Sequence, residues 1–264
     1  MEGEAGGTGS LGPKPLAVVL LSGGMDSLTA AGMARRDNFE LALIHFNYGQ
    51  RTEEAELKAF KRIADWFEVP EPLRLVVHTN FFTLAGGSAL TDRSLPVPEA
   101  DLASGRIPPT YVPFRNAVLL SMAVGWAETL GAKAVYYGAV SQDSSGYPDC
   151  RPGFVAAMNA LVREGTRPET AIEIRAPLVH LSKADIVKAA LEMGLPLDRS
   201  WSCYRRNDRA CGTCDSCALR LRGFALAGIP DPIPYAPPGS PDREALRERA
   251  RRLVRLLNAL ARKG

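Results

Sequence analysis

Short apolar runs alternate along the chain with longer segments of mixed polarity. The apolar runs are typical of buried strands and lie at 16–21, 41–47, 73–78, 134–140 and 172–179. The segments between them predict helices at 27–36, 52–67, 115–130, 153–163 and 183–193. Because strands and helices alternate, the pattern predicts an α/β fold with a doubly wound, mostly parallel sheet. The ligand crevice of such a sheet lies beyond the carboxyl ends of its strands.

Three segments do not follow this alternation. Residues 80–113 contain two adjacent glycines and five prolines without a sustained period, which is typical of a functional lid or a disordered loop. Residues 241–262 predict an amphipathic helix that packs on the core or in a dimer. We therefore expect a flexible tail at 1–14, an α/β domain at 15–195, and a region at 196–264 that holds helices and a cysteine cluster.

Composition and charge limit the function. At 264 residues the chain can bury a sizeable core, and its net charge of +3 is too small to predict a nucleic-acid-binding protein. No apolar stretch reaches the roughly 20 residues of a membrane span, and the start has no signal-peptide pattern. Crowded cysteines without a secretory context favour a metal site over disulfides. We expect a cytoplasmic protein that contacts no membrane.

The first predicted strand breaks into the polar turn Ser22-Gly23-Gly24-Met25-Asp26-Ser27. Paired glycines allow a sharp turn and a close approach of the backbone to a ligand. Asp26 or Ser27 can cap the following helix, whose free N–H groups would then form an anion site. The turn lacks the lysine of the Walker A loop and does not fit G-x-G-x-x-G. It therefore predicts a phosphate site of another kind, and an ordinary strand-to-helix turn is the alternative.

Polar residues also follow the later strands, and so gather at the same edge of the sheet. Arg51 follows the second strand, where it either meets a phosphate or carboxylate or is a solvated charge. Arg115 and Asn116 open the helix at 115–130, where a guanidinium and an amide can bind phosphate or a planar base. Lys183 lies in the first turn of a helix, where a cation gains nothing from the helix dipole. This position indicates that Lys183 faces an anion, with a solvated lysine as the alternative.

The loop at 141–151 follows the fourth strand and is rich in hydrogen-bonding side chains. Asp143 and Asp149 can accept hydrogen bonds from ring N–H and amino groups, and Tyr147 can stack on a flat heterocycle. Arg151 can pair with a carboxylate. Taken as bare residues, they are equally consistent with an ordinary polar loop.

Four cysteines lie close together near the C-terminal end of the chain. Cys203 precedes Cys211 by eight positions, and Cys214 and Cys217 follow in C-x-x-C-x-x-C spacing. Four thiolates in so short a span can complete a tetrahedral Zn²⁺ shell, which is the mark of a structural site. An iron–sulfur cluster is the alternative, because cysteine spacing does not exclude it. Cys150 stands apart from this cluster.

Six motifs together carry a resemblance to one family. SGGMDS, YGQR, VPFRN, SGYPDCR, LSKADI and the cysteine cluster follow one another in this order. Over residues 16–230 the chain resembles the 7-cyano-7-deazaguanine synthase (QueC) family, which belongs to the PP-loop ATP pyrophosphatases. Phe114 occupies a position that is often Gly or Ala in that family, and the helix at 241–262 lies outside the shared core.

The resemblance implies an ATP-dependent C–N ligase that converts 7-carboxy-7-deazaguanine and ammonia to 7-cyano-7-deazaguanine (preQ0) in queuosine biosynthesis. It implies ATP with Mg²⁺, one structural Zn²⁺ per chain, a lid at 80–113 and a homodimer. The implied catalytic residues are Asp26, Lys183 and Arg115, and the implied phosphate or magnesium contacts are Ser22, Gly23, Gly24, Asp26 and Ser27. The implied substrate-binding residues are Gln50, Arg51, Asn116, Asp143, Tyr147, Asp149 and Arg151, and the implied zinc ligands are Cys203, Cys211, Cys214 and Cys217.

Three other functions stay open. A relative on the same scaffold could ligate the deazaguanine to another amine, such as a protein terminus. A PP-loop tRNA thiolase would need a sulfur-carrying cysteine near the ATP site. A zinc-knuckle protein could bind nucleic acid through the arginines around the cysteines, and would then show salt-dependent RNA binding without ATP consumption.

Overall fold

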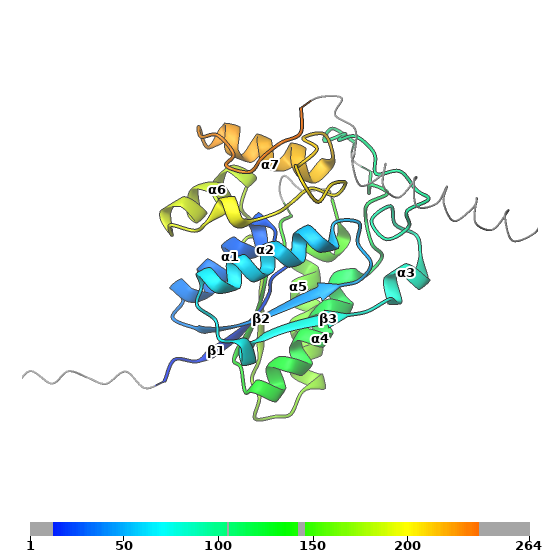
Figure 1. The fold of residues 1–264 in the computed structure, drawn as a ribbon. Coiled ribbons are helices and arrows are strands. Elements are labelled where there is room, and N and C mark those ends of the chain that lie inside the picture. Colours follow the sequence, from blue (N-terminus) through cyan, green and yellow to red (C-terminus); the bar gives the residue numbers. More distant parts are fainter. Residues whose placement is uncertain (1–12, 105, 142–145, 238–264) are drawn as a thin grey trace, which may run out of the picture.

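The computed structural model describes residues 13–104, 106–141 and 146–237, which form a parallel sheet between two layers of helices (Figure 1). The strands are β1 (Leu16–Leu20), β2 (Glu40–Asn47), β3 (Arg74–His78), β4 (Ala134–Tyr137) and β5 (Glu173–Arg175). Their order is β3-β2-β1-β4-β5, and every neighbouring pair is parallel. The predicted fold class, a doubly wound α/β sheet, is therefore confirmed.

The helices cover both faces of this sheet. They are α1 (Met25–Arg36), α2 (Glu53–Trp66), α3 (Phe81–Ala85), α4 (Arg115–Leu130), α5 (Pro152–Gly165), α6 (Lys183–Glu192) and α7 (Asp215–Leu226). Short 3-10 turns lie at Glu71–Leu73, Pro148–Cys150 and Leu197–Arg199. Buried side chains of α1, α2, α6 and α7 share one core with one face of the sheet, and those of α4 and α5 share a second core with the other face (Figure 1).

The central strand β1 shows why its sequence is continuously apolar. Ala17 and Val19 point into the core beneath α1, while Val18 points into the core beneath α4, and all three are fully buried. Successive side chains of a strand alternate between its faces. Both faces of this strand are covered, so a run without polar alternation is the pattern it requires.

Two strands are shorter than predicted. β4 ends at Tyr137 rather than at 140, because Gly138 passes against the first turn of α1. A Cβ built at Gly138 would lie 2.7 Å from the carbonyl carbon of Asp26, so only glycine fits there. β5 spans Glu173–Arg175 rather than 172–179, and the chain turns away before Pro177, which has no N–H to donate to a ladder.

Of the two helix caps predicted from the sequence, one is wrong and one is confirmed. The expectation that Asp26 or Ser27 caps α1 is wrong, because Gly24 is the N-cap and both residues lie inside the first turn. The Ser27 hydroxyl instead donates to the Gly24 carbonyl at 3.0 Å. The capping box predicted for α6 is confirmed, since Ser182 and Asp185 each accept a hydrogen bond from the other's backbone N–H.

The loop at 80–113 contains one short helix, α3, and is otherwise irregular. Arg51 holds its middle, donating from Nε to the Ala89 carbonyl at 2.7 Å and from Nη2 to the Asp92 carbonyl at 2.9 Å. Its later part is tied to the cysteine-rich segment, where Arg205 donates to the Val97 carbonyl at 2.8 Å. The loop is therefore an ordered layer joined to two neighbouring segments, and its action as a lid stays a prediction.

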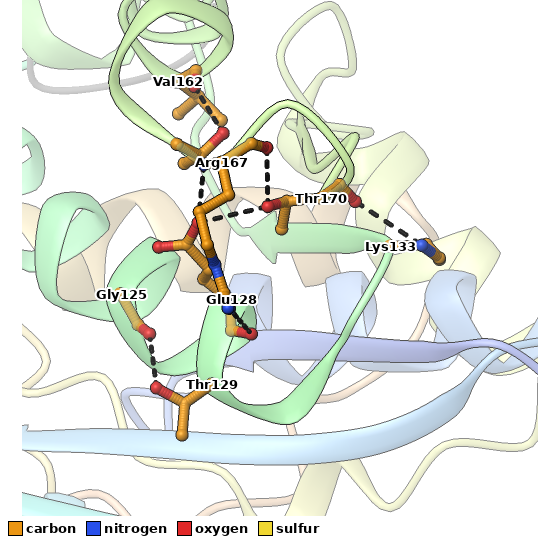
Figure 2. Close-up of polar contacts among 8 residues, drawn as sticks. Gly125, Glu128, Thr129, Lys133, Val162, Arg167 and Thr170 are labelled. Atoms are coloured by element: carbon orange, nitrogen blue, oxygen red, sulfur yellow. Dashed lines mark hydrogen bonds and ion pairs between the residues drawn. The ribbon is translucent and has the colours of Figure 1, made fainter.

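A polar network joins α4 to the segment before β5 (Figure 2). Glu128 Oε1 accepts hydrogen bonds from the Arg167 backbone N–H at 2.8 Å and from the Thr170 hydroxyl at 3.1 Å. The Thr170 carbonyl accepts from Lys133 Nζ at 3.5 Å. The Arg167 N–H is the largest cause of a lowered pKa at Glu128. This network lies at the edge of the sheet where β1 and β4 begin, and so braces the scaffold away from their carboxyl ends.

Some predictions fall on residues outside the described ranges. They are the tail up to residue 12, the helix at 241–262, and Asp143. Among the residues that are described, no helix has the length and apolar character that a membrane crossing needs.

Candidate functional site

A cavity of about 260 Å³ lies at the carboxyl ends of β1, β2 and β4. Its walls come from the turn after β1, the first residues of α4 and α6, and the segment at 201–204. The chain leaves β1 toward α1 on one face of the sheet and leaves β4 toward α5 on the other. The gap between β1 and β4 is thus the topological switch point, where ligands of such sheets bind.

The turn after β1 is built for an anion. Gly23 has φ +90°, and a Cβ there would lie 2.6 Å from the Glu56 carbonyl oxygen, so the position requires glycine. Gly24 is the N-cap of α1 and has no side chain that could accept hydrogen bonds from the first-turn N–H groups. The hydroxyls of Ser22 and Ser27 lie 3.1 Å apart beside them. N–H groups and hydroxyls gathered at a helix N-terminus fit phosphate oxygens.

Asp26 and Lys183 meet across this turn. Lys183 Nζ lies 2.5 Å from Asp26 Oδ2, and the lysine side chain is 11% exposed. The anion that the position of Lys183 predicted is therefore present in the protein itself. Asp26 Oδ1 is buried and has no hydrogen-bond partner among the described residues. A buried carboxylate oxygen that lines a cavity and lacks a partner fits a divalent cation such as Mg²⁺.

Arg115 and Asn116 begin α4 on the opposite wall. Arg115 Nη1 donates to the Tyr48 hydroxyl at 2.8 Å, and its guanidinium carbon lies 5.6 Å from the centre of that ring. Asn116 holds the loop before α5, because its backbone N–H donates to Asp149 Oδ2 at 2.9 Å and its Nδ2 to the Asp149 carbonyl at 3.2 Å. Asp149 Oδ1 is buried and without a partner in the part of the chain that is described.

The cysteine sulfurs converge beside the cavity. The Sγ atoms of Cys203, Cys211, Cys214 and Cys217 all lie within 4.8 Å of one another. Backbone N–H groups point at them, including that of Cys214, which lies 3.4 Å from Cys211 Sγ. Four thiolates at such spacing could hold one metal ion. The segment at 201–204 also contacts the turn at 22–27, here named the phosphate turn, because the Trp201 N–H donates to the Gly23 carbonyl at 2.8 Å.

A family model described as "Queuosine biosynthesis protein QueC" matches residues 16–228. The chain belongs to the QueC family. It is 56% identical over 219 residues to a 7-cyano-7-deazaguanine synthase of Chlorobium luteolum, an alignment that covers 83% of this chain and 96% of the relative. A synthase of Chlorobaculum parvum is 54% identical over the same shares. The resemblance drawn from the six motifs is thereby confirmed.

Solved structures show a more distant likeness to this QueC-family chain. A 4-thiouridine synthetase in complex with RNA and bound ATP is 17% identical with a TM-score of 0.44, and the match covers 84% of this chain and 47% of that one.

Most residues predicted for the site of this QueC-family chain do line the cavity. They are Ser22, Gly24, Asp26, Ser27, Gln50, Arg51, Arg115, Asn116, Tyr147 and Lys183. The amide of Gln50 is already engaged, since Oε1 accepts from the Tyr48 N–H at 2.8 Å and Nε2 donates to the Phe46 carbonyl at 3.1 Å. The Arg51 guanidinium likewise serves the loop at 80–113. Both side chains position cavity walls, and their direct contact with a substrate stays a prediction.

Two predicted substrate residues lie outside the cavity lining, and a third is not described. Arg151 is exposed at the N-cap of α5 and outside the cavity lining, so this arrangement does not bring it to a ligand in the cavity. Asp149 lies behind the wall formed by Asn116 and Cys150. Asp143 lies outside the described residues.

Several cavity residues escaped the sequence analysis. Trp201 and Tyr204 flank the cysteine at 203, and Trp201 Nε1 is buried without a partner in the described residues. Glu56 comes from the first turn of α2, and burial raises the pKa of its carboxyl against the hydrogen bonds of Thr52 and Gln50. Tyr137 ends β4. Glu56 and Tyr137 lie within a helical and an apolar pattern, which gave no sign that they line a cavity. For Trp201 and Tyr204, the position beside Cys203 was the signal that could have predicted a place near the site.

Proposed function

We propose that this QueC-family chain converts 7-carboxy-7-deazaguanine, ATP and ammonia to 7-cyano-7-deazaguanine, as an ATP-dependent C–N ligase of queuosine biosynthesis. The observation that carries the proposal is the cavity in which an anion-binding helix N-terminus, the Asp26–Lys183 pair and Arg115 face one another. The names of its relatives, identical at more than half of the aligned positions, support the product.

The first chemical step activates the carboxylate of the base. A carboxylate is a poor electrophile, so one of its oxygens attacks the α-phosphorus of ATP and displaces pyrophosphate. The turn at 22–27 binds the departing pyrophosphate through N–H groups and hydroxyls. Lys183 and Arg115 bring positive charge to phosphate oxygens in a partly buried site, where such charge is most effective. Mg²⁺ held at Asp26 would neutralise further charge on the phosphates.

The second and third steps need no nucleophile from the protein. Ammonia attacks the acyl carbon, AMP leaves, and an amide forms after loss of a proton. The amide oxygen is then activated by a second ATP in the same way, and loss of AMP and two protons from nitrogen yields the nitrile. Each activation develops negative charge at the same phosphate site, so one set of cations serves both.

We also propose that the metal of the four-cysteine cluster is Zn²⁺ in a structural role. A complete thiolate shell leaves no open coordination position for a substrate. When bound, the ion would hold the segment at 201–204 against the phosphate turn. Location in the cytoplasm and assembly as a homodimer remain parts of the proposal that rest on the family.

Product analysis tests the proposed function. The full-length chain is incubated with ATP, Mg²⁺, ¹⁵N-ammonium and 7-carboxy-7-deazaguanine. The products are then separated, and their masses are measured by mass spectrometry. We expect a base that carries one ¹⁵N in a nitrile, and no such product when ATP is omitted. A folded, metal-loaded preparation that forms no nitrile would refute the proposal, and an adduct with another amine would identify the ligating relative instead.

A further inference from the structure

Tyr137 lines the cavity and carries a buried hydroxyl that has no partner among the described residues. Its side chain lies in the core on the α4 side, beside Leu119, and is 4% exposed. The hydroxyl is buried and forms no hydrogen bond with any described residue, and Tyr137 lines the cavity. Burying a hydroxyl without a hydrogen bond costs free energy, so buried polar groups nearly always have partners. An unpaired hydroxyl that faces a cavity therefore points to a partner on the ligand.

Tyr136, the preceding residue, shows that the missing hydrogen-bond partner is specific to the face of β4 that carries Tyr137. Tyr136 points into the opposite core, where its hydroxyl donates to Asp37 Oδ2 at 2.7 Å and accepts from Arg175 Nη1 at 3.0 Å. Two tyrosines at adjacent positions of one strand thus have opposite hydrogen-bonding states. The hydroxyl that faces away from the cavity is satisfied within the protein, and the one that faces the cavity is not.

Asp149 lies behind the cavity wall and contributes to the electrostatics of the Tyr137 hydroxyl. Asp149 uses Oδ2 to accept from the Asn116 N–H, while its Oδ1 is buried and unpaired within the described residues. Burial, followed by the charges of Cys150 and Asp149, raises the pKa of Tyr137 well above its usual value. The hydroxyl therefore keeps its proton and acts as a donor. This corner of the site therefore presents a hydrogen-bond donor.

We infer that Tyr137 determines specificity for the base, because its hydroxyl donates to the ring carbonyl of the deazaguanine. The inference rests on the proposed function. A guanine-like base carries a ring carbonyl, which can accept a hydrogen bond from such a hydroxyl. Adenine carries an amino group in place of that carbonyl, and the phosphates of ATP fit the N–H groups and hydroxyls of the turn after β1.

The test compares the two adjacent tyrosines. Calorimetry measures binding of 7-carboxy-7-deazaguanine and of ATP to metal-loaded wild type, Tyr137→Phe and the control Tyr136→Phe. We expect Tyr137→Phe to bind the base about tenfold more weakly and ATP unchanged, because one hydrogen bond to the base is lost. Tyr136→Phe should bind both ligands as the wild type does. An analogue of the base without its ring carbonyl oxygen should bind the wild type and Tyr137→Phe equally.

The stability of the ligand-free variants gives a readout independent of activity. Tyr137→Phe removes a hydroxyl that has no partner and should unfold at the same or a higher temperature than the wild type, whereas Tyr136→Phe loses two hydrogen bonds and should unfold lower. If Tyr137→Phe does not fold, the carbonyl-free analogue tests the same contact on the wild type by its affinity.

Three results would overturn the inference. They are unchanged affinity of Tyr137→Phe for the base, a loss confined to ATP, or full affinity of the wild type for the carbonyl-free analogue. With any of these, a wild type that still forms the nitrile leaves the proposed function intact. A wild type that neither binds the base nor forms the nitrile overturns both.

Discussion

The two carboxylate oxygens of Asp26 have different surroundings, and this difference assigns their roles. Oδ2 pairs with Lys183 Nζ at 2.5 Å, and Oδ1 is buried without a partner among the described residues. An ion pair satisfies both charges only while both partners are present, and removing one leaves an uncompensated charge. The pair therefore keeps a lysine ready beside the phosphate turn in the absence of ATP.

Lys183→Met should lower kcat by about 100- to 1,000-fold, because a fixed positive charge is removed from the site where phosphate charge develops. Methionine keeps the approximate length of the lysine side chain and removes its charge. Steady-state nitrile formation measures the effect. Lys188→Met is the matched control, since Lys188 is exposed on the same helix. A Lys183→Met rate within threefold of the wild type would contradict the role proposed for this residue.

Cys150 should be an unreactive thiol although it lines the cavity. Burial first, and then the charge of Asp149, raise its pKa to about 11. A raised pKa keeps the thiol protonated until the pH approaches that value, so roughly one molecule in a thousand carries the thiolate at pH 8. We expect iodoacetamide to leave Cys150 unmodified at pH 8 in the metal-loaded protein, as measured by peptide mass spectrometry. Rapid labelling there would show that the thiol is ionised or exposed.

At the scale of elements, the site depends on how closely the end of β4 approaches the start of α1. Gly138 lies where a Cβ would be 2.7 Å from the Asp26 carbonyl carbon and 2.8 Å from the Ser27 nitrogen. Both contacts are to backbone atoms, which cannot move aside as a flexible side chain can. The distance between the two elements is therefore set by the absence of one methyl group.

Gly138→Ala should push α1 away from β4, lower stability by about 1–3 kcal/mol and weaken ATP binding. Denaturant unfolding and calorimetry measure the two effects. Gly125→Ala is the matched control, because no heavy atom of the described structure lies within 4 Å of a Cβ there and the residue sits within α4. That change should stabilise the protein by about 0.5–1 kcal/mol. Equal effects of the two substitutions would contradict the steric argument.

The sequence predicted the elements better than it predicted side-chain partners. The apolar run before Gly23 and the capping box at Ser182 depend on local chemistry, so strand, turn and helix were predictable from neighbouring residues. The guanidinium of Arg51 donates to backbone carbonyls of a loop some forty positions later in the chain, and no local pattern predicts such partners. The sequence did not distinguish Tyr137 from Tyr136, because the partner of the Tyr136 hydroxyl is Asp37, 99 positions away. Such pairings arise only when the sheet forms.

At the scale of the whole molecule, the four-cysteine cluster and the cavity belong to one unit. Cys203 lies between Trp201 and Tyr204, which line the cavity, and the Trp201 N–H donates to the phosphate turn. Arg220 of α7 is almost fully buried, donates from Nη1 to the Ser202 hydroxyl at 3.3 Å and pairs through Nε with Asp231 at 2.7 Å. Loss of the metal should therefore reach the cavity through the residues on either side of Cys203.

Removal of the metal by a thiol-compatible chelator should lower Tm by on the order of 5–10 °C and raise KM for ATP, because the segment at 201–204 is released from the phosphate turn. Elemental analysis should find one zinc per chain before chelation, and an absorbance band in the visible region would identify an iron–sulfur cluster instead. Adding Zn²⁺ back should restore both Tm and KM. Since the ion pair of Arg220 with Asp231 needs no metal, α7 should stay folded on α6, and circular dichroism should change little. A chelated protein with unchanged KM for ATP would show that the cluster stabilises the fold without shaping the site.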